Sequence, residues 1–130
     1  MLEDSTIDRN FIGTGTEGAA PGITSLISKL DMKDNTFSNH ECRKGCFLTI
    51  QTASTLTDKG STFTNAKAKE AGVMYIIEST ATFEGTRFVG NTANEFADIY
   101  AQGNSYVNLQ YAHFENSKSI GAGPACISMR

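Results

Sequence analysis

Two acidic side chains and three tyrosines are the residues whose types and spacing come closest to carbohydrate chemistry. Cleavage of a glycosidic bond needs two carboxylates within several ångströms of each other, or a carboxylate-bound metal ion. When the chain is aligned by its internal repeat, Asp58 and Glu84 fall on neighbouring rows. Tyr100, Tyr106 and Tyr111 are candidates for an aromatic strip that contacts sugars. A surface carboxylate pair is more often solvated than catalytic, so no catalytic residue is predicted. The two carboxylates and three tyrosines are kept as alternative candidates for contact with a sugar.

The two histidines and three cysteines form no recognisable reactive or metal-binding motif. His40 and His113 have no nucleophile or metal-ligand partner at a familiar spacing. The cysteines lack the paired spacing of a zinc site and are too few for a disulfide scaffold. Free cysteines are commonly buried, so we expect Cys46 and Cys126 to be small core residues, while the state of Cys42 stays open. Neither a metal ion nor a cofactor is predicted.

The composition favours short strands and turns over long helices. The 130 residues include 12 Gly, 2 Pro and no Trp, and 39% are hydrophobic, which suffices for one modest core. A net charge of -3 without a basic stripe argues against nucleic acid as a partner. No window reaches the length and apolarity of a transmembrane segment, and Met1–Arg9 lacks the basic and apolar parts of a signal peptide.

Phenylalanine recurs with a nearly constant period, at steps of 26, 26, 25 and 26 residues. It occupies positions Phe11, Phe37, Phe63, Phe88 and Phe114. Asparagine follows shortly after four of them, at Asn39, Asn65, Asn91 and Asn116. Asn tolerates a left-handed backbone, so we interpret this row as a structural turn and not as a polar binding site. The two prolines support the period, since Pro21 and Pro124 are separated by 103 residues, as are the first and last of these phenylalanines.

Each unit of the repeat reads as two or three short strands. Apolar and polar residues alternate before each Phe, as in Ala81-Thr82-Phe83, which is typical of a half-buried strand. A second apolar run follows the turn, as at positions 73–77, and its β-branched and aromatic residues favour strand. Units too short for a crossover helix close only by coiling. We therefore predict that residues 1–130 form a single all-β domain, a right-handed parallel β-helix of four to five coils of about 26 residues.

Equivalent residues of successive coils should then stack in rows. Inside the tube we expect, besides the Phe row, one row at Leu30, Leu56, Phe83 and Leu109, and another at Leu48, Tyr75, Ile99 and Ile127. The same alignment gives a row of Asp31, Thr57, Glu84 and Gln110, and next to it Met32, Asp58, Gly85 and Tyr111.

The Phe-x-Asn turns at 37–39 and 63–65, together with strand starts such as Gly45-Cys46-Phe47-Leu48, resemble repeats of the pectin-lyase-like parallel β-helix superfamily. The likeness is strongest to polymorphic outer-membrane-protein type repeats and to repeats of large protist surface proteins, and it covers about Ile7 to Met129. It implies the fold more specifically than a function. Many enzymes of the superfamily cleave polysaccharides with clustered Asp, Ca²⁺ and a basic residue.

Two functions fit these observations. The first is a non-catalytic structural or adhesive β-helix, either a segment of a surface or filament protein or a subunit that stacks end to end or laterally with itself or a larger assembly. The alternative is a carbohydrate-binding or carbohydrate-cleaving protein. The repeat starts midway, at positions 7–11, and stops midway, at 125–129, without a cap, so we expect protein to cover the C-terminal coil. We expect an extracellular or cell-surface location.

Overall fold

Short β-strands joined by turns are the only regular elements in the part of the chain that the computed structural model describes. This part comprises residues 23–26, 29–43, 45–70, 72–121, 123–124 and 126–129. The strands belong to four sheets, which we number in chain order.

The first sheet contains β1 (Ile23–Leu26), β5 (Leu48–Gln51), β9 (Met74–Ile77), β13 (Ile99–Gln102) and β17 (Ile127–Met129). The second contains β2 (Lys29–Lys33), β6 (Thr55–Lys59), β10 (Thr80–Glu84) and β14 (Tyr106–Gln110). The third contains β3 (Thr36–Ser38), β7 (Thr62–Thr64), β11 (Arg87–Val89) and β15 (His113–Glu115). The fourth contains β4 (Glu41–Cys42), β8 (Lys67–Ala68), β12 (Thr92–Ala93) and β16 (Lys118–Ser119).

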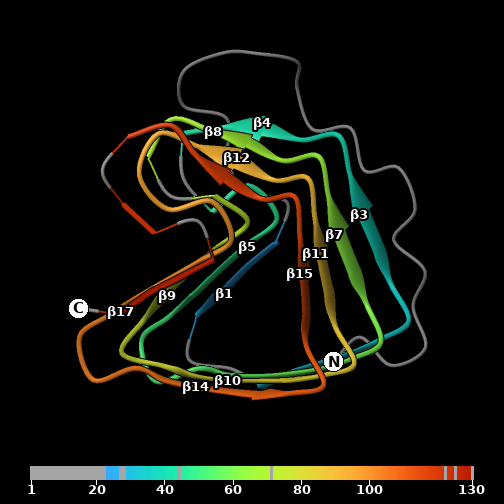
Figure 1. Cartoon of the computed structure of the whole chain (residues 1–130). Coiled ribbons are helices and arrows are strands. Elements are labelled where there is room, and N and C mark those ends of the chain that lie inside the picture. The colour runs from blue at the N-terminus through green and yellow to red at the C-terminus, as the bar shows by residue number, and fades with distance from the viewer. Residues whose placement is uncertain are drawn as a thin grey trace.

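Every strand pair in these sheets is parallel and joins strands that lie one coil apart in the chain. Figure 1 shows the chain following the second, third and fourth sheets in turn and then returning along the first. Backbone hydrogen bonds also cross between coils in the turns, where the Asn39 N–H donates to the Thr64 carbonyl at 3.1 Å. The described residues therefore form a parallel β-solenoid of about four turns, as the repeat predicts.

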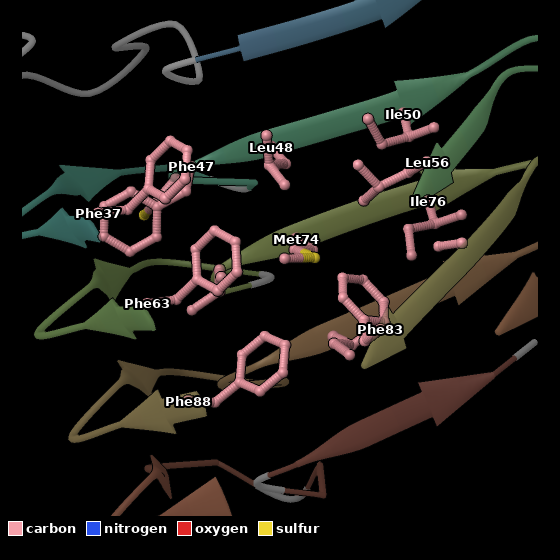
Figure 2. Close-up of a cluster of buried hydrophobic side chains, with 14 of the residues drawn as sticks. Phe37, Phe47, Leu48, Ile50, Leu56, Phe63, Met74, Ile76, Phe83 and Phe88 are labelled. Carbon is pink, nitrogen blue, oxygen red and sulfur yellow. The ribbon is translucent and has the colours of Figure 1, made fainter. Parts of the chain in front are cut away.

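The phenylalanines of the repeat lie in register in the third sheet. Phe37 pairs with Phe63, Phe63 with Phe88 and Phe88 with Phe114. Their rings stack along the axis with centroid separations of 4.8, 5.4 and 4.8 Å. Figure 2 shows the first three of these rings above one another inside the coils, where each is at most 1% exposed. Phe11 lies outside the described residues.

One inward row of the second sheet is aligned differently from the prediction. Leu56 pairs with Ala81 and not with Phe83, which instead pairs with Asp58. Phe83 nevertheless points inward and is fully buried, because a shift of two residues along a strand keeps the same face. The alternation of apolar and polar residues is satisfied by both alignments, so it did not distinguish them.

The inward row of the first sheet contains Met74 in place of Tyr75. Leu48 pairs with Met74, Met74 with Ile99, and Ile99 with Ile127. Tyr75, predicted in this row, is half-buried and takes the opposite face of β9. The expectation was wrong by one residue, and a shift of one residue reverses the face of the strand.

A left-handed backbone residue marks the turn between the third and fourth sheets. The φ angle is 56° at Asn39, 56° at Asn65 and 55° at Asn116. Between β11 and β12 the same position is occupied by Gly90, with a φ of 64°. Asn91, which we predicted in this turn, lies one residue further on and is buried. Glycine adopts positive φ without steric cost, so the turn needs no asparagine here.

The cysteines differ from the expectation of small, unlinked core residues. Cys42, at the end of β4, forms a disulfide with Cys46, and their Cα atoms are 5.2 Å apart. The left-handed conformation of Gly45, with a φ of 62°, belongs to the turn between them. Cys46 is fully buried as expected but is linked, while Cys126 is only partly buried. Sequence spacing did not reveal the disulfide, because a separation of four positions does not by itself bring two thiols within bonding distance.

Phe63→Ala should lower the free energy of unfolding by about 3 to 5 kcal/mol, as for other large core truncations. Its ring is stacked on both sides, so neighbouring coils cannot collapse into the gap. Phe114→Ala, at the partly buried end of the same row, is the matched control and should cost less. Chemical denaturation of both variants tests this. Equal losses, or a loss under about 1 kcal/mol for Phe63→Ala, would contradict a buried ladder.

Candidate functional site

The carboxylates of Asp58 and Glu84 lie on opposite sides of the tube wall. Asp58 is fully buried and pairs across strands with Phe83. Glu84 pairs with Lys59, and its carboxylate lies 3.0 Å from the Lys59 ammonium on the outside. The expected pairing of Glu84 with Thr57 was wrong because the register is shifted by two residues. The two carboxylates therefore do not form the surface pair that glycosidic cleavage requires.

Asp58 is a buried carboxyl group within an otherwise apolar row. The Thr86 hydroxyl donates a hydrogen bond to its Oδ2, while its Oδ1 has no partner among the described residues. Burial raises the pKa of Asp58, against the effect of hydrogen bonds from Ser61 and Thr86, and the nearby charge of Asp34 raises it further. Its burial and its hydrogen bond from Thr86 favour a structural role for this carboxyl group over a reactive one.

The tyrosines do not gather into one strip. Tyr100 of β13 stacks on Tyr75 of β9, with ring centroids 5.3 Å apart and planes 9° apart. The Tyr75 hydroxyl is held by Gln102, 2.8 Å away, on the outside of the first sheet. Tyr106 begins β14 in the second sheet and Tyr111 follows that strand, with 62% and 89% of their surfaces exposed. Tyr100 is thus on a different sheet from the other two sugar-contact candidates.

Asp98 is the centre of a buried polar cluster that joins three segments of the chain. It precedes β13, and its Oδ1 accepts hydrogen bonds from Asn91 Nδ2 and from Ser117 Oγ, each at 2.9 Å. Asn91 also donates to the Phe63 carbonyl at 3.1 Å and accepts from the Ala66 N–H at 3.0 Å. Asn91 is therefore a buried connector between coils and not a turn residue.

This cluster contains a carboxyl group that changes charge in mildly acidic solution. Burial raises the pKa of Asp98 to about 6, although the hydrogen bonds from Ser117 and Asn91 act in the opposite direction. Asp98 Oδ2 has no hydrogen-bond partner among the described residues. Burial, together with the charge of Asp98, also raises the pKa of the Cys126 thiol. Since Asp98 is fully buried, its ionisation is coupled to the stability of the fold.

A polar groove of about 350 Å³ lies on the outside, along the turn between the third and fourth sheets. Besides the buried His40, it is lined by six residues that define what we call the turn groove: Asn39, Asn65, Gly90, Glu41, Lys67 and Thr92. The first three are successive turn residues, one per coil. The other three are successive outward residues of β4, β8 and β12, aligned strand by strand. Two rows of the repeat, two residues apart in the chain, thus border the groove.

The row of turn residues is interrupted inside this groove. Asn65 Nδ2 donates to Asn39 Oδ1 at 3.4 Å, a long hydrogen bond. The next position is Gly90, where an added Cβ would lie 3.0 Å from Asn65 Oδ1. Because Gly90 has no side chain, the row of amide side chains ends at Asn65. No ion pair joins Glu41 or Lys67 to another of the described residues, so both charges face the groove unpaired.

Sequence reasoning missed both Asp98 and the turn groove. A signal for the groove was present, because Gly90 replaces asparagine at the turn position once the Phe residues are aligned. Nothing in the sequence marked Glu41, Lys67 and Thr92, since alternating outward residues are ordinary in half-buried strands. Asp98 was obscured because polar residues next to a strand usually lie in exposed turns.

The described residues contain no group of three or more His, Cys, Asp or Glu side chains that could hold a metal ion. Within the same ranges no helix has the length and apolar character needed to cross a membrane.

No protein-family model matches this chain, and no curated protein or solved structure matches it significantly.

Replacing Asp98 by Asn should remove a pH dependence of stability. The pKa of Asp98 is about 6 in the folded chain and 3.8 for an ordinary aspartate, so the protonated carboxyl group stabilises the fold. This stabilisation is complete below pH 3.8 and is lost as the pH rises through about 6. Its size is about 3 kcal/mol at most. Unfolding free energies from pH 4 to 7 should thus fall more steeply for the native chain than for Asp98→Asn. Glu95→Gln, an exposed neighbour, is the control, and identical slopes for native chain and Asp98→Asn would refute the assignment.

Proposed function

We propose that this chain is a non-catalytic structural or adhesive solenoid, one continuous unit whose coils stack with other coils of its kind. It serves either as a segment of a larger surface or filament protein or as a subunit of an assembly. The separation of Asp58 from Glu84 removes the main reason to favour a carbohydrate-cleaving enzyme. Most repeated side chains contribute to stacking between coils.

The observation that carries this proposal is the apolar end face of the coil formed by β14 and β15. Val107, Leu109 and Phe114 occupy inward positions, and the residues that pair with them in β10 and β11 are fully buried. At this end the three side chains are only partly buried, although they pack against the core. Among the described residues, β14 and β15 each pair on one side only. Uncovered strand edges and apolar rows are templates for another coil.

An extracellular or cell-surface location is supported by the disulfide between Cys42 and Cys46. Disulfides persist in oxidising surroundings and are rare where glutathione keeps thiols reduced. Both cysteines are at most 5% exposed, so the bond is sheltered in the fold. The same linkage fits a surface protein that must keep its shape outside a cell.

The assembly is tested by comparing two lysine variants of neighbouring residues. Leu109→Lys places a charge on the apolar end face, whereas Gln110→Lys, an exposed residue next to it, leaves that face unchanged. The native chain and Gln110→Lys should associate as concentration increases, and electron microscopy should show stacked particles. Leu109→Lys should associate less while keeping the same circular dichroism spectrum. A native chain that stays a monodisperse monomer with ordered end coils in size-exclusion chromatography would overturn the proposal.

The proposed location is tested by labelling thiols in protein isolated from its natural source without reductant. Cys42 and Cys46 should remain unlabelled after unfolding, because they are linked, while Cys126 should be labelled. Reduction before labelling is the control and should expose all three thiols. Quantitative labelling of Cys42 and Cys46 without reductant would place the protein in a reducing compartment.

A further inference from the structure

We infer that the turn groove, defined by Asn39, Asn65, Gly90, Glu41, Lys67 and Thr92, is a binding site for a neutral sugar unit. The site lies on a different face from the tyrosines and acidic residues considered as sugar contacts in the sequence. The inference rests on the adhesive part of the proposed function, because it supplies a surface by which the solenoid attaches to a ligand. The two proposals can fail separately, since binding to the groove requires only the folded chain.

The groove offers the mixture of donors and acceptors that sugar hydroxyl groups require. A hydroxyl group donates one hydrogen bond and accepts up to two. The amides of Asn39 and Asn65 each contain both a donor and an acceptor, and the single bond between them uses Asn65 Nδ2 and Asn39 Oδ1. Asn65 Oδ1 and Asn39 Nδ2 are left for a ligand. The Glu41 carboxylate accepts, the Lys67 ammonium donates and the Thr92 hydroxyl does both.

The charges in the groove favour a neutral ligand over an ion. Glu41 and Lys67 are paired residues of adjacent parallel strands, about 4.8 Å apart. Their opposite charges leave these two positions with no net charge, so the groove does not select an anion or a cation by charge. A neutral polyhydroxylated ligand uses both groups for hydrogen bonding. The one aromatic ring in the lining, that of His40, is only 2% exposed and packs against Phe47, so the groove presents no apolar face to a ligand.

The size and the backbone of the groove set the expected mode of binding. Its volume of about 350 Å³ is near the lower end of ligand pockets, which suits about one or two sugar rings. The floor is held by backbone bonds between coils, such as Lys67 N–H to the His40 carbonyl and Thr92 N–H to the Ala66 carbonyl, both 2.8 Å. Because the polar side chains are exposed, each site should bind weakly, and stacked copies would gain by multivalency.

Gly90→Asn is the sharpest variant for testing this site. Asparagine adopts the same left-handed backbone at positions 39, 65 and 116, so its introduction at a φ of 64° continues the existing row. Its Cβ would lie 3.0 Å from Asn65 Oδ1, so the added side chain displaces the Asn65 amide slightly and competes with the ligand for it. Gly85→Asn is the matched control, because Gly85 has the same φ of 64° and no atom within 4 Å of an added Cβ. Both variants should fold as the native chain does.

The experiment is an NMR titration of the labelled chain with three neutral trisaccharides, built from glucose, mannose and N-acetylglucosamine. At least one should cause saturable shifts at Asn39, Asn65, Lys67 and Thr92 up to about 10 mM, where a millimolar site is nearly filled. Gly90→Asn should weaken this binding about tenfold or more, and Gly85→Asn should leave it unchanged.

Three outcomes would overturn the inference. The first is the lack of saturable shifts with every trisaccharide. The second is binding that Gly90→Asn leaves intact, which would place the sugar elsewhere on the solenoid. The third is saturation of these same residues by glycine, used as a zwitterionic probe, but by no sugar, which would show that the pair Glu41 and Lys67 selects ions. None of these results depends on whether the chain assembles.

Discussion

Parallel pairing between coils is the constraint on which the rest of this molecule depends. Each strand bonds to the strand one coil away, so equivalent residues lie directly above one another at about 4.8 Å. A residue's environment is therefore set mainly by positions about 26 residues earlier and later. The buried rings of Phe37, Phe63 and Phe88 illustrate the favourable result, since identical side chains stack and fill the tube continuously.

The same constraint makes exceptions conspicuous and costly inside the tube. Asp58 lies in a row otherwise occupied by apolar side chains, and Asp98 is fully buried against Asn91 and Ser117. Each has one carboxyl oxygen that is hydrogen-bonded and one that is not. Burial raises the pKa of both, so both favour folding more strongly in acid than in neutral solution. The stability of the fold is therefore coupled to the ionisation of these two buried groups.

On the outer surface, a break in a row has a different consequence. Gly90 preserves the left-handed turn but supplies no side chain, so the ladder of amides stops and a recess opens beside Glu41 and Lys67. At the end of the stack, partly buried Leu109 and Phe114 continue rows that are fully buried in the preceding coil. The described residues thus present two types of surface, an apolar end face at β14 and β15 and a polar flank at the turn groove.

The period of 25 or 26 residues and the Phe-x-Asn turns were sufficient to predict a parallel solenoid, because each feature is a local consequence of chain geometry. Alternation could not fix register between coils, since a shift of two residues leaves Phe83 buried but changes its partner from Leu56 to Asp58. Nor could sequence spacing reveal that Cys42 and Cys46 meet. The turn groove and the Asp98 cluster depend on residues from three different coils. Such sites exist only once hydrogen bonds between coils set the register, and tertiary structure alone brings their members together.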